Sequence, residues 1–464
     1  MTDNKKILPK LRFPEFENDG EWKVVKLGDV VTFCNSKCDR SELKIETYIS
    51  TENILQDFLG VKRAVNLPQN GSFTKFCIGD ILVSNIRPYL KKIWQADFEG
   101  AASNDVLVFR TKDQNNDKYV AHLLKSNAFV NYCMEGAKGV KMPRGDKALM
   151  LEYSIPFPSL PEQQKIAAFL TSLDEQISAH KKKLEALKAH KKGLMQQLFP
   201  ANGEKTPKLR FPEFKNEREW EEDSMQNIFE IKNGYTPSKA NNEYWNNGTI
   251  PWFRMEDIRN NGHILSDSIQ HITPQAVKGG KLFPAFSIIV ATTATIGEHA
   301  LVIVDSLANQ RFTFLTKCKS FDSKLDMLYF HYYMFIVDEW CKLNTNAGGL
   351  LSVNMPAFKQ LQIPIPSLPE QKKIASFLSS IDDMIQAQDD KIQKLKTYKN
   401  GLMQQMFAVE TPYYDVSTDG NKPMTPYYDI STDDDKKTGT TYYDVSTNDD
   451  KPMTPYYDVS TGNN

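Results

Sequence analysis

The sequence is poor in the features that mark membrane, secreted and zinc-dependent proteins. No apolar run approaches the roughly 20 residues that a membrane helix needs, and the N-terminal stretch MTDNKKILPK lacks the apolar core of a signal peptide. Only Cys34 and Cys38 are close among six scattered cysteines, and no His or Cys pair at zinc-site spacing accompanies them. We therefore expect a cytoplasmic protein with free thiols, which are favoured over a zinc site.

Motifs of catalysis are missing as well. No Pro-Pro pair occurs, which excludes the Asn-Pro-Pro-aromatic or Asp-Pro-Pro-aromatic motif of an adenine methyltransferase. The sequence has no GxxxxGK[ST] loop for ATP, and it lacks the Pro-Asp pair of a nuclease carboxylate cluster. These absences predict a chain that binds and positions other molecules, with no catalytic residue, metal site or cofactor of its own.

The net charge of −1 conceals two differently charged parts. The tail from Val409 onward carries 11 acidic residues and 4 lysines, whereas the preceding 408 residues carry 53 basic and 47 acidic residues. The tail repeats a Tyr-Tyr-Asp pattern and is rich in Asp, Ser, Thr and Pro, so we expect it to be disordered. A mildly basic body permits nucleic-acid binding without requiring it.

Repeated stretches organise the body of the chain. PKLRFPEF occurs at 9–16 and again at 207–214, and a Glu-Trp pair follows each copy. The block IPFPSLPEQQKIAAFLTSLDEQI, at 155–177, matches residues 363–385 at 16 of 23 positions. Residues 22–154 and 220–362, which lie between the repeats, align poorly. The pattern therefore predicts one scaffold that holds two divergent inserts.

Each copy of the long repeat predicts a long helix. The SLPE sequence that opens it is typical of an N-cap serine, a first-turn proline and a capping-box glutamate, Glu162 or Glu370. Apolar residues then recur at alternating steps of four and three, which predicts a coiled-coil seam. They are Ile166, Leu170, Leu173, Ile177, Leu184, Leu187, Leu194 and Leu198, and then Ile374, Leu378, Ile381, Ile385, Ile392, Leu395, Leu402 and Met406.

Polar residues interrupt the seam at matching positions, His180 and Lys191 in the first copy and Gln388 and Lys399 in the second. Isolated polar positions commonly fix the register of a coiled coil, so we interpret His180 as a register residue and not as a metal ligand. Helices of about 38 residues would be roughly 57 Å long. They pack most simply antiparallel within the chain, which predicts pseudo-twofold symmetry and a fixed distance between the inserts.

Both inserts are expected to be mixed α/β domains. In the first, strands are predicted at 79–86 and 104–110 and a helix at 119–135. In the second, strands are predicted at 286–297 and 309–316 and a helix at 325–343.

Loops of both inserts are rich in residue types that contact nucleic acids. Lys and Arg neutralise phosphates, while Arg, Asn, Gln, Ser and Thr can hydrogen-bond base edges. The candidates of the first insert are Ser84, Asn85, Arg87, Tyr89, Lys91, Lys92, Lys138, Lys141, Arg144 and Lys147. Those of the second are Tyr235, Ser238, Lys239, Arg254, Thr292, Thr293, Asn309, Gln310 and Arg311. The alternative is that the lysine-rich loops are merely solvated and that Trp245 and Trp252 are core residues.

Together these motifs resemble the specificity (S) subunits of type I restriction-modification systems. The resemblance covers residues 9–408, and it rests on KLRFPEF followed by EW, on the twice-occurring IP[FI]PSLPEQ[QK]KIA, and on YTPSKANNEYWNNGTIPW at 235–252. It implies an α+β fold with two α/β target recognition domains. Two long helices separate them and form an antiparallel intramolecular coiled coil with pseudo-twofold symmetry. The tail after Phe407 departs from the family pattern.

The resemblance also implies a division of the chain and its partners. Each recognition domain would recognise one half of a bipartite target in double-stranded DNA, and the helices would set the spacing. Two methyltransferase subunits would dock on the helical regions and endonuclease/translocase subunits would join them, so that S-adenosylmethionine, ATP and magnesium belong to the partners. The expected parts are an N-terminal segment (1–20), recognition domain 1 (21–154), helical spacer 1 (155–200), a linker with the repeated segment (201–219), recognition domain 2 (220–362), helical spacer 2 (363–408) and the tail (409–464).

One rival from another class is a coiled-coil adaptor whose inserts bind proteins. It explains the heptads, but it does not explain why two inserts on one frame differ while both carry Arg, Asn and Lys in their loops. Salt-dependent binding to duplex DNA would separate the two hypotheses.

Overall fold

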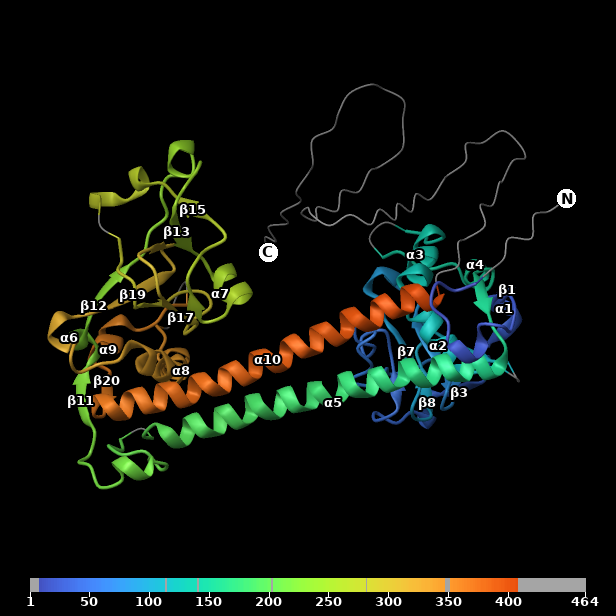
Figure 1. Cartoon of the computed structure of the whole chain (residues 1–464), viewed down its shortest axis with the longest axis horizontal. Coiled ribbons are helices and arrows are strands. Elements are labelled where there is room, and N and C mark those ends of the chain that lie inside the picture. The colour runs from blue at the N-terminus through green and yellow to red at the C-terminus, as the bar shows by residue number, and fades with distance from the viewer. Residues whose placement is uncertain are drawn as a thin grey trace. The chain divides into compact units, whose positions relative to one another are not determined.

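Two long antiparallel helices, α5 (Leu160–Leu198) and α10 (Leu368–Phe407), pack along one another (Figure 1). The computed structural model describes residues 8–112, 115–139, 142–201, 203–280, 282–346 and 351–407. Every residue of the predicted apolar seam is buried or half-buried. The predicted α+β fold with an intramolecular coiled coil is therefore confirmed, whereas the expected disorder of residues 409–464 concerns residues outside the described ranges.

The middle of the seam is polar. The Gln388 side-chain nitrogen lies 2.8 Å from His180 Nδ1 and donates to the His180 carbonyl oxygen at 3.0 Å. Residues 180 and 388 are equivalent positions of the repeat, so their contact marks the local pseudo-twofold axis. This geometry agrees with the interpretation of His180 as a register residue.

Two ion pairs flank this centre symmetrically. The Lys191 ammonium lies 2.6 and 2.8 Å from the two carboxylate oxygens of Asp382. The Lys399 ammonium lies 2.6 Å from both oxygens of Asp174. The predicted polar interruptions of the seam thus bond across it, and a shift of one heptad would separate all of them.

The first insert contains two four-stranded sheets, with strand orders β2-β9-β6-β7 and β3-β5-β8-β4. The strands are β2 (Val31–Phe33), β3 (Lys37–Asp39), β4 (Tyr48–Ile49), β5 (Ser72–Phe76), β6 (Ile81–Ser84), β7 (Ile93–Gln95), β8 (Gly100–Ala102) and β9 (Val106–Thr111). The helices are α1 (Leu27–Val30), α2 (Asp117–Leu124), α3 (Asn127–Glu135) and α4 (Lys147–Leu151). The helix predicted at 119–135 is therefore two helices, because Ser126 caps α3 by accepting a bond from the Phe129 amide.

The second insert contains a five-stranded sheet, β12-β19-β16-β17-β14, and a three-stranded one, β15-β13-β18. The strands are β12 (Phe229–Asn233), β13 (Ile250–Phe253), β14 (Ile264–Leu265), β15 (His271–Ile272), β16 (Ser287–Ala291), β17 (His299–Val302), β18 (Leu307–Ala308) and β19 (Phe312–Lys317). The helices are α6 (Met225–Ile228), α7 (Met255–Asn261), α8 (Met327–Leu343) and α9 (Met355–Gln360). The strand predicted at 286–297 ends at Ala291, and the residues beyond it form a loop.

Each insert leaves the frame through a short antiparallel strand pair. In the first half β1 (Lys23–Lys26) pairs with β10 (Ser154–Phe157), and in the second half β11 (Glu221–Ser224) pairs with β20 (Gln362–Ile365). Both ends of an insert therefore lie side by side, so the chain enters and leaves each insert at one place.

Each insert shares its core with both long helices. The first insert packs on the start of α5, at Ile166 and Leu170, and on the end of α10, at Met406. The second insert packs on the start of α10 and on the end of α5, and the shared residues include Leu198 and Ile374. The inserts are thus held at opposite ends of the helix pair.

The repeated PKLRFPEF segment fastens each half to the start of its long helix. Arg12 donates from Nε and one terminal nitrogen to the two carboxylate oxygens of Glu162, at 2.7 and 2.8 Å. Trp22 Nε1 donates to the same carboxylate at 3.1 Å. Arg210 and Glu370 form the same bidentate pair, at 2.8 Å for both bonds. We call these two pairs the clasps.

The clasps replace the predicted capping boxes. Ser159 is the N-cap of α5, but its side chain makes no capping hydrogen bond. Glu162 is 1% exposed and faces Arg12 instead of the helix end. A bidentate, charge-assisted pair is stronger than a capping bond, so the capping-box prediction is wrong and the glutamate fastens the repeated segment.

We expect Arg12→Ala to destabilise the chain by about 3–5 kcal/mol, because it leaves the buried Glu162 carboxylate without its cation. Lys165→Ala is the matched control, since Lys165 pairs with Glu15 in the same segment while both side chains are about half exposed. An exposed pair contributes about 0–1 kcal/mol. Urea denaturation of the two variants and the wild type measures the difference, and equal losses would contradict the assignment of the clasp.

Candidate nucleic-acid interface

In the first insert, the two predicted clusters of DNA-binding residues are paired through their backbones. The loop after β6 meets the loop before α4, with a bridge between Ile86 and Arg144. The Gly145 amide donates to the Asn85 carbonyl at 3.1 Å, and the Arg87 amide donates to the Pro143 carbonyl at 2.8 Å. The structure therefore brings the candidates around 84–92 and 138–147 onto one surface.

Arg87 stands at the most constrained point of this surface. Its φ is +52°, and Lys91, four residues later, has φ of +53°. Non-glycine residues seldom adopt this left-handed conformation, and where they do the strain is often functional. The Arg87 side chain is exposed and has no hydrogen-bond or ion-pair partner among the described residues. The backbone thus fixes the direction in which the free Arg87 side chain leaves the loop.

Lys92 adds a half-buried positive charge beside it. The ammonium donates to the Thr51 carbonyl at 2.7 Å. Burial lowers the pKa of Lys92, and the nearby cations Lys62 and Arg87 lower it further, whereas the charge of Glu52 raises it. Like charges gathered in this way raise the local positive potential, which attracts a phosphate backbone.

The remaining candidates of the first insert differ in accessibility. Ser84 and Asn85 are buried, and the Asn85 side-chain oxygen has no hydrogen-bond partner among the described residues. Tyr89, Lys138, Arg144 and Lys147 are exposed, although Lys138 pairs with Asp146 and Arg144 with Asp105. Lys141 lies outside the described residues.

The second insert repeats the same loop pairing. Thr293 bridges Ser352, and the Val353 amide donates to the Thr292 carbonyl at 2.9 Å. These contacts correspond to those of Ile86, Arg144, Gly145 and Asn85 in the first insert. The residue equivalent to Arg87 is Ala294, whose φ is also positive at +67°. Both inserts therefore present one backbone geometry with different side chains.

This equivalence identifies two candidates that the sequence did not reveal. The Asn346 amide donates to the Ser352 carbonyl at 2.9 Å, as the Lys138 amide does to the Arg144 carbonyl. Asn346 and Ser352 thus occupy the places of Lys138 and Arg144. Asn346 follows Lys138, and Ser352 follows Arg144, by 208 residues, which is also the offset between the two long helices. This shared offset is a sequence signal that could have identified both candidates.

The other polar candidates of the second insert converge on the same edge. The Asn309 amide bonds to the carbonyl of Phe253, the residue before Arg254, and the Thr292 amide bonds to the Arg311 carbonyl, both at 3.1 Å. Gln310 contacts the Thr236 hydroxyl. Hydrogen bonds thus connect the loops that carry these candidates.

Arg254 is less free than Arg87. Its guanidinium pairs with Glu256 at 2.8 Å and lies 5.9 Å from the Trp252 ring. Trp252 is 2% exposed and packs edge-on against Trp245 in a small core, which agrees with the core interpretation of both. To contact DNA, the Arg254 guanidinium would have to break its ion pair with Glu256 and bond to a phosphate or base instead.

The Tyr235 loop is anchored at both ends and exposed between them. The Tyr235 hydroxyl donates to the Ala276 carbonyl at 3.2 Å. Trp245 Nε1 donates to the Ser238 carbonyl at 3.0 Å. Ser238 and Lys239 are exposed. Their side chains are therefore available while their backbone is held.

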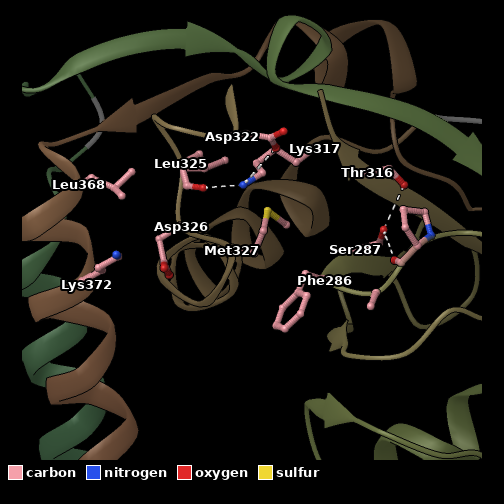
Figure 2. Close-up of a pocket in the computed structure, with 12 residues that line it drawn as sticks. Phe286, Ser287, Thr316, Lys317, Asp322, Leu325, Asp326, Met327, Leu368 and Lys372 are labelled. Carbon is pink, nitrogen blue, oxygen red and sulfur yellow. Dashed lines mark hydrogen bonds and ion pairs between the residues drawn. The ribbon is translucent and has the colours of Figure 1, made fainter. Parts of the chain in front are cut away.

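A separate hollow of about 520 Å³ lies between the second insert and the start of α10 (Figure 2). Its lining mixes Phe286 and Met327 with charged residues such as Lys317, Asp322 and Lys372. Phe286 is 59% exposed and has a positive φ of +61°. None of the DNA-binding candidates lines this hollow.

The described residues offer no group of three or more His, Cys, Asp or Glu side chains placed to hold a metal ion. Cys38 packs with Phe73 in a core, while burial, followed by the charge of Asp80, raises the pKa of Cys34 to about 11. Within the same residues, every helix is too short or too polar to cross a membrane.

Known proteins are similar in sequence to much of this chain. The Escherichia coli type I restriction enzyme EcoprrI specificity subunit is 50% identical over 157 residues, which cover 34% of this chain and 39% of that subunit. The MjaVIII specificity subunit of Methanocaldococcus jannaschii is 24% identical over 426 residues, or 86% of this chain and 94% of that one.

Solved structures share the fold. A chain from a structural study of complex assembly and conformational transition of the type I R-M system has a TM-score of 0.52 at 20% identity, over 83% of this chain and 97% of that one. The type I restriction-modification S subunit from M. genitalium has a TM-score of 0.51 at 14% identity, over 86% and 99%.

The family model described as "Type I restriction modification DNA specificity domain" matches twice, at residues 19–189 and 217–397. Each match contains one insert and most of the long helix that follows it. The chain therefore belongs to the type I restriction-modification DNA specificity family.

Proposed function

We propose that this chain is the non-catalytic DNA-recognition subunit of a type I restriction-modification complex, and that each insert recognises one half of a bipartite duplex target. The observation that carries the proposal is the paired loop found at equivalent places in both inserts, with one backbone geometry and different side chains. A common backbone suits a common ligand, while different side chains suit different base sequences. Residues 21–154 and 220–362 are then the two target recognition domains.

The long helices set the distance between the half-sites in this proposal. The first insert packs at one end of the α5–α10 pair and the second insert packs at the other end. The polar contacts in the seam hold the two helices in one register relative to each other. Two methyltransferase subunits dock on the helical regions, and endonuclease/translocase subunits join them. The complex methylates adenines in the target or cleaves unmodified DNA, and the partners bind S-adenosylmethionine, ATP and magnesium.

Binding of the purified chain to duplex DNA over a range of salt concentrations tests this function. Phosphate contacts predict that the logarithm of the binding constant falls linearly with the logarithm of the salt concentration. An adaptor that binds only proteins would show no such binding. Mapping methylated adenines in cells with and without this gene identifies the two half-sequences.

We expect Arg87→Ala and Arg254→Ala each to weaken binding to the cognate duplex by about 1–3 kcal/mol and to relax discrimination at one base position. Arg87 has the larger expected effect, because its guanidinium is free whereas Arg254 first has to leave Glu256. Arg218→Ala is the control, since Arg218 is an 83%-exposed arginine of the frame. Affinity is measured on the cognate duplex and on single-base variants. Wild-type affinity and sequence preference in both variants would remove these residues from the interface.

A further inference from the structure

An insert residue lies beside each ion pair that connects the long helices. In the second half the Asp382 carboxylate of α10 accepts from Lys191 of α5 at 2.6 and 2.8 Å, and from the Tyr332 hydroxyl of α8 at 2.8 Å. The Lys191 ammonium also lies 5.1 Å from the centre of the Tyr332 ring. One carboxylate thus bonds both the opposite long helix and the second insert. We call Asp382, Lys191 and Tyr332 the second junction.

The first half has an equivalent site with a different insert residue. Tyr119 of α2 and Tyr329 of α8 make the same bond, each hydroxyl donating at 3.0 Å to a proline carbonyl in the strand that leaves the insert. This bond aligns α2 with α8. His122, three residues after Tyr119, therefore occupies the place of Tyr332.

His122 does not bond to its carboxylate. Its Nδ1 lies 3.9 Å from Asp174, beyond hydrogen-bond distance, and has no hydrogen-bond partner among the described residues. Its Nε2 lies 3.2 Å from the Thr171 hydroxyl. Lys399 still bonds to Asp174 at 2.6 Å, so this first junction holds the two helices together without a hydrogen bond to the insert.

Because only the second junction has a hydrogen bond to its insert, we expect the second insert to be held at a more restricted angle on the long helices than the first. A strand pair joins each insert to the frame at one place, and the insert also packs on both long helices. Hydrophobic packing has no direction of its own, so a directional polar contact further restricts the angle of the insert on the helices. The Tyr332 hydroxyl supplies such a contact to a charged acceptor, and hydrogen bonds of this kind are stronger than neutral ones. The first insert also packs on both long helices but lacks this bond.

We propose that the second junction is a positioning site, whose Tyr332 bond fixes the angle of the second insert on the long helices and so restricts the half-site spacings that the complex accepts. Tyr332 makes the second junction the tighter of the two. The inference rests on the bipartite function proposed above and adds to it a determinant of spacing outside the DNA-binding loops.

Methylation of duplexes with altered spacers tests the proposal. The full chain, assembled with its methyltransferase subunits, is given the mapped target with its native spacer and with spacers one base pair shorter or longer. Tyr332→Phe keeps the ring but removes the donor. We expect the preference for the native spacer to fall about tenfold, which corresponds to about 1.4 kcal/mol, with both half-sequences unchanged. His122→Tyr adds a donor to the first junction, and we expect it to increase that preference.

Tyr329→Phe is the matched control, because its hydroxyl lies on the same helix but bonds to the Pro364 carbonyl of β20 and not to either long helix. This variant should lose stability without a change in spacer preference. Wild-type spacer preference in both Tyr332→Phe and His122→Tyr would overturn the proposal, as would a changed half-sequence. If Tyr332→Phe does not fold, the spacer preference of His122→Tyr alone tests the proposal. A wild-type complex without any preferred spacer would contradict the bipartite function instead.

Discussion

Replacing residues 225–361 with the corresponding part of another specificity subunit is expected to change one half of the methylated sequence and leave the other half unchanged. These limits keep β11 and β20 in the frame, where Met225 and Leu361 are joined by a backbone bond of 2.9 Å. The exchanged insert would carry its own paired loop. Each mismatched base pair costs about 1–3 kcal/mol, so three mismatches in the old half-site would reduce its recognition by at least about a hundredfold.

Genome-wide mapping of methylated adenines measures the outcome of this exchange. The control is the same exchange of residues 27–153 in the first insert, bounded by the Leu27 amide and the Tyr153 carbonyl at 2.7 Å. It should change the opposite half of the target. A single exchange that alters both half-sequences, or neither, would show that the inserts are not independent recognition modules.

The sequence predicts the helical frame well because its signal is local and repeated. A seam with apolar steps of four and three over five heptads leaves few alternatives to a coiled coil. The matching interruptions at His180 and Gln388 even mark the centre of the structure. Local patterns of this kind need no knowledge of distant contacts.

The clasps show where local patterns fail. SLPE at the start of a helix has the sequence of a capping box, yet Glu162 bonds to Arg12, which is 150 residues away. Nothing near Glu162 in the sequence indicates that partner. The exact repetition of PKLRFPEF indicated a structural role for the segment, but only the fold identifies Arg12 and Arg210 as its anchors.

The candidate interface was predictable in composition but not in detail. Residue type placed Asn85 and Arg87 together in a loop, but it did not show that Asn85 is buried while Arg87 is exposed. Residue type did not reveal the equivalence of Arg144 and Ser352, because the inserts have different side chains where they share a backbone, and only the 208-residue offset of the repeated helices points to it. Divergence of this kind is what recognition of two different half-sequences requires.

Duplicating residues 177–183 in α5 and 385–391 in α10 is expected to lengthen the preferred spacer by about three base pairs. Seven residues add about 10 Å to each helix at 1.5 Å per residue, and base pairs are about 3.4 Å apart. Because the helices are antiparallel and His180 faces Gln388 at their centre, the two duplicated segments lie opposite each other and lengthen the pair without a change of register. Each copied His180 then faces a copied Gln388, while the pairs Lys191–Asp382 and Lys399–Asp174 stay outside the duplicated part and keep their partners.

A library of duplexes with the native half-sequences and spacers from the original length to six base pairs longer measures the result. The range is needed because three base pairs also turn one half-site about the DNA axis by roughly 105°, given about 10–10.5 base pairs per turn. Duplication in α5 alone is the control, because it cannot keep both ion pairs and should abolish methylation at every spacing. Methylation by the double variant at the original spacing, with wild-type efficiency, would show that the helices do not set the distance. The spacing would then have to come from the insert loops or from the partner subunits.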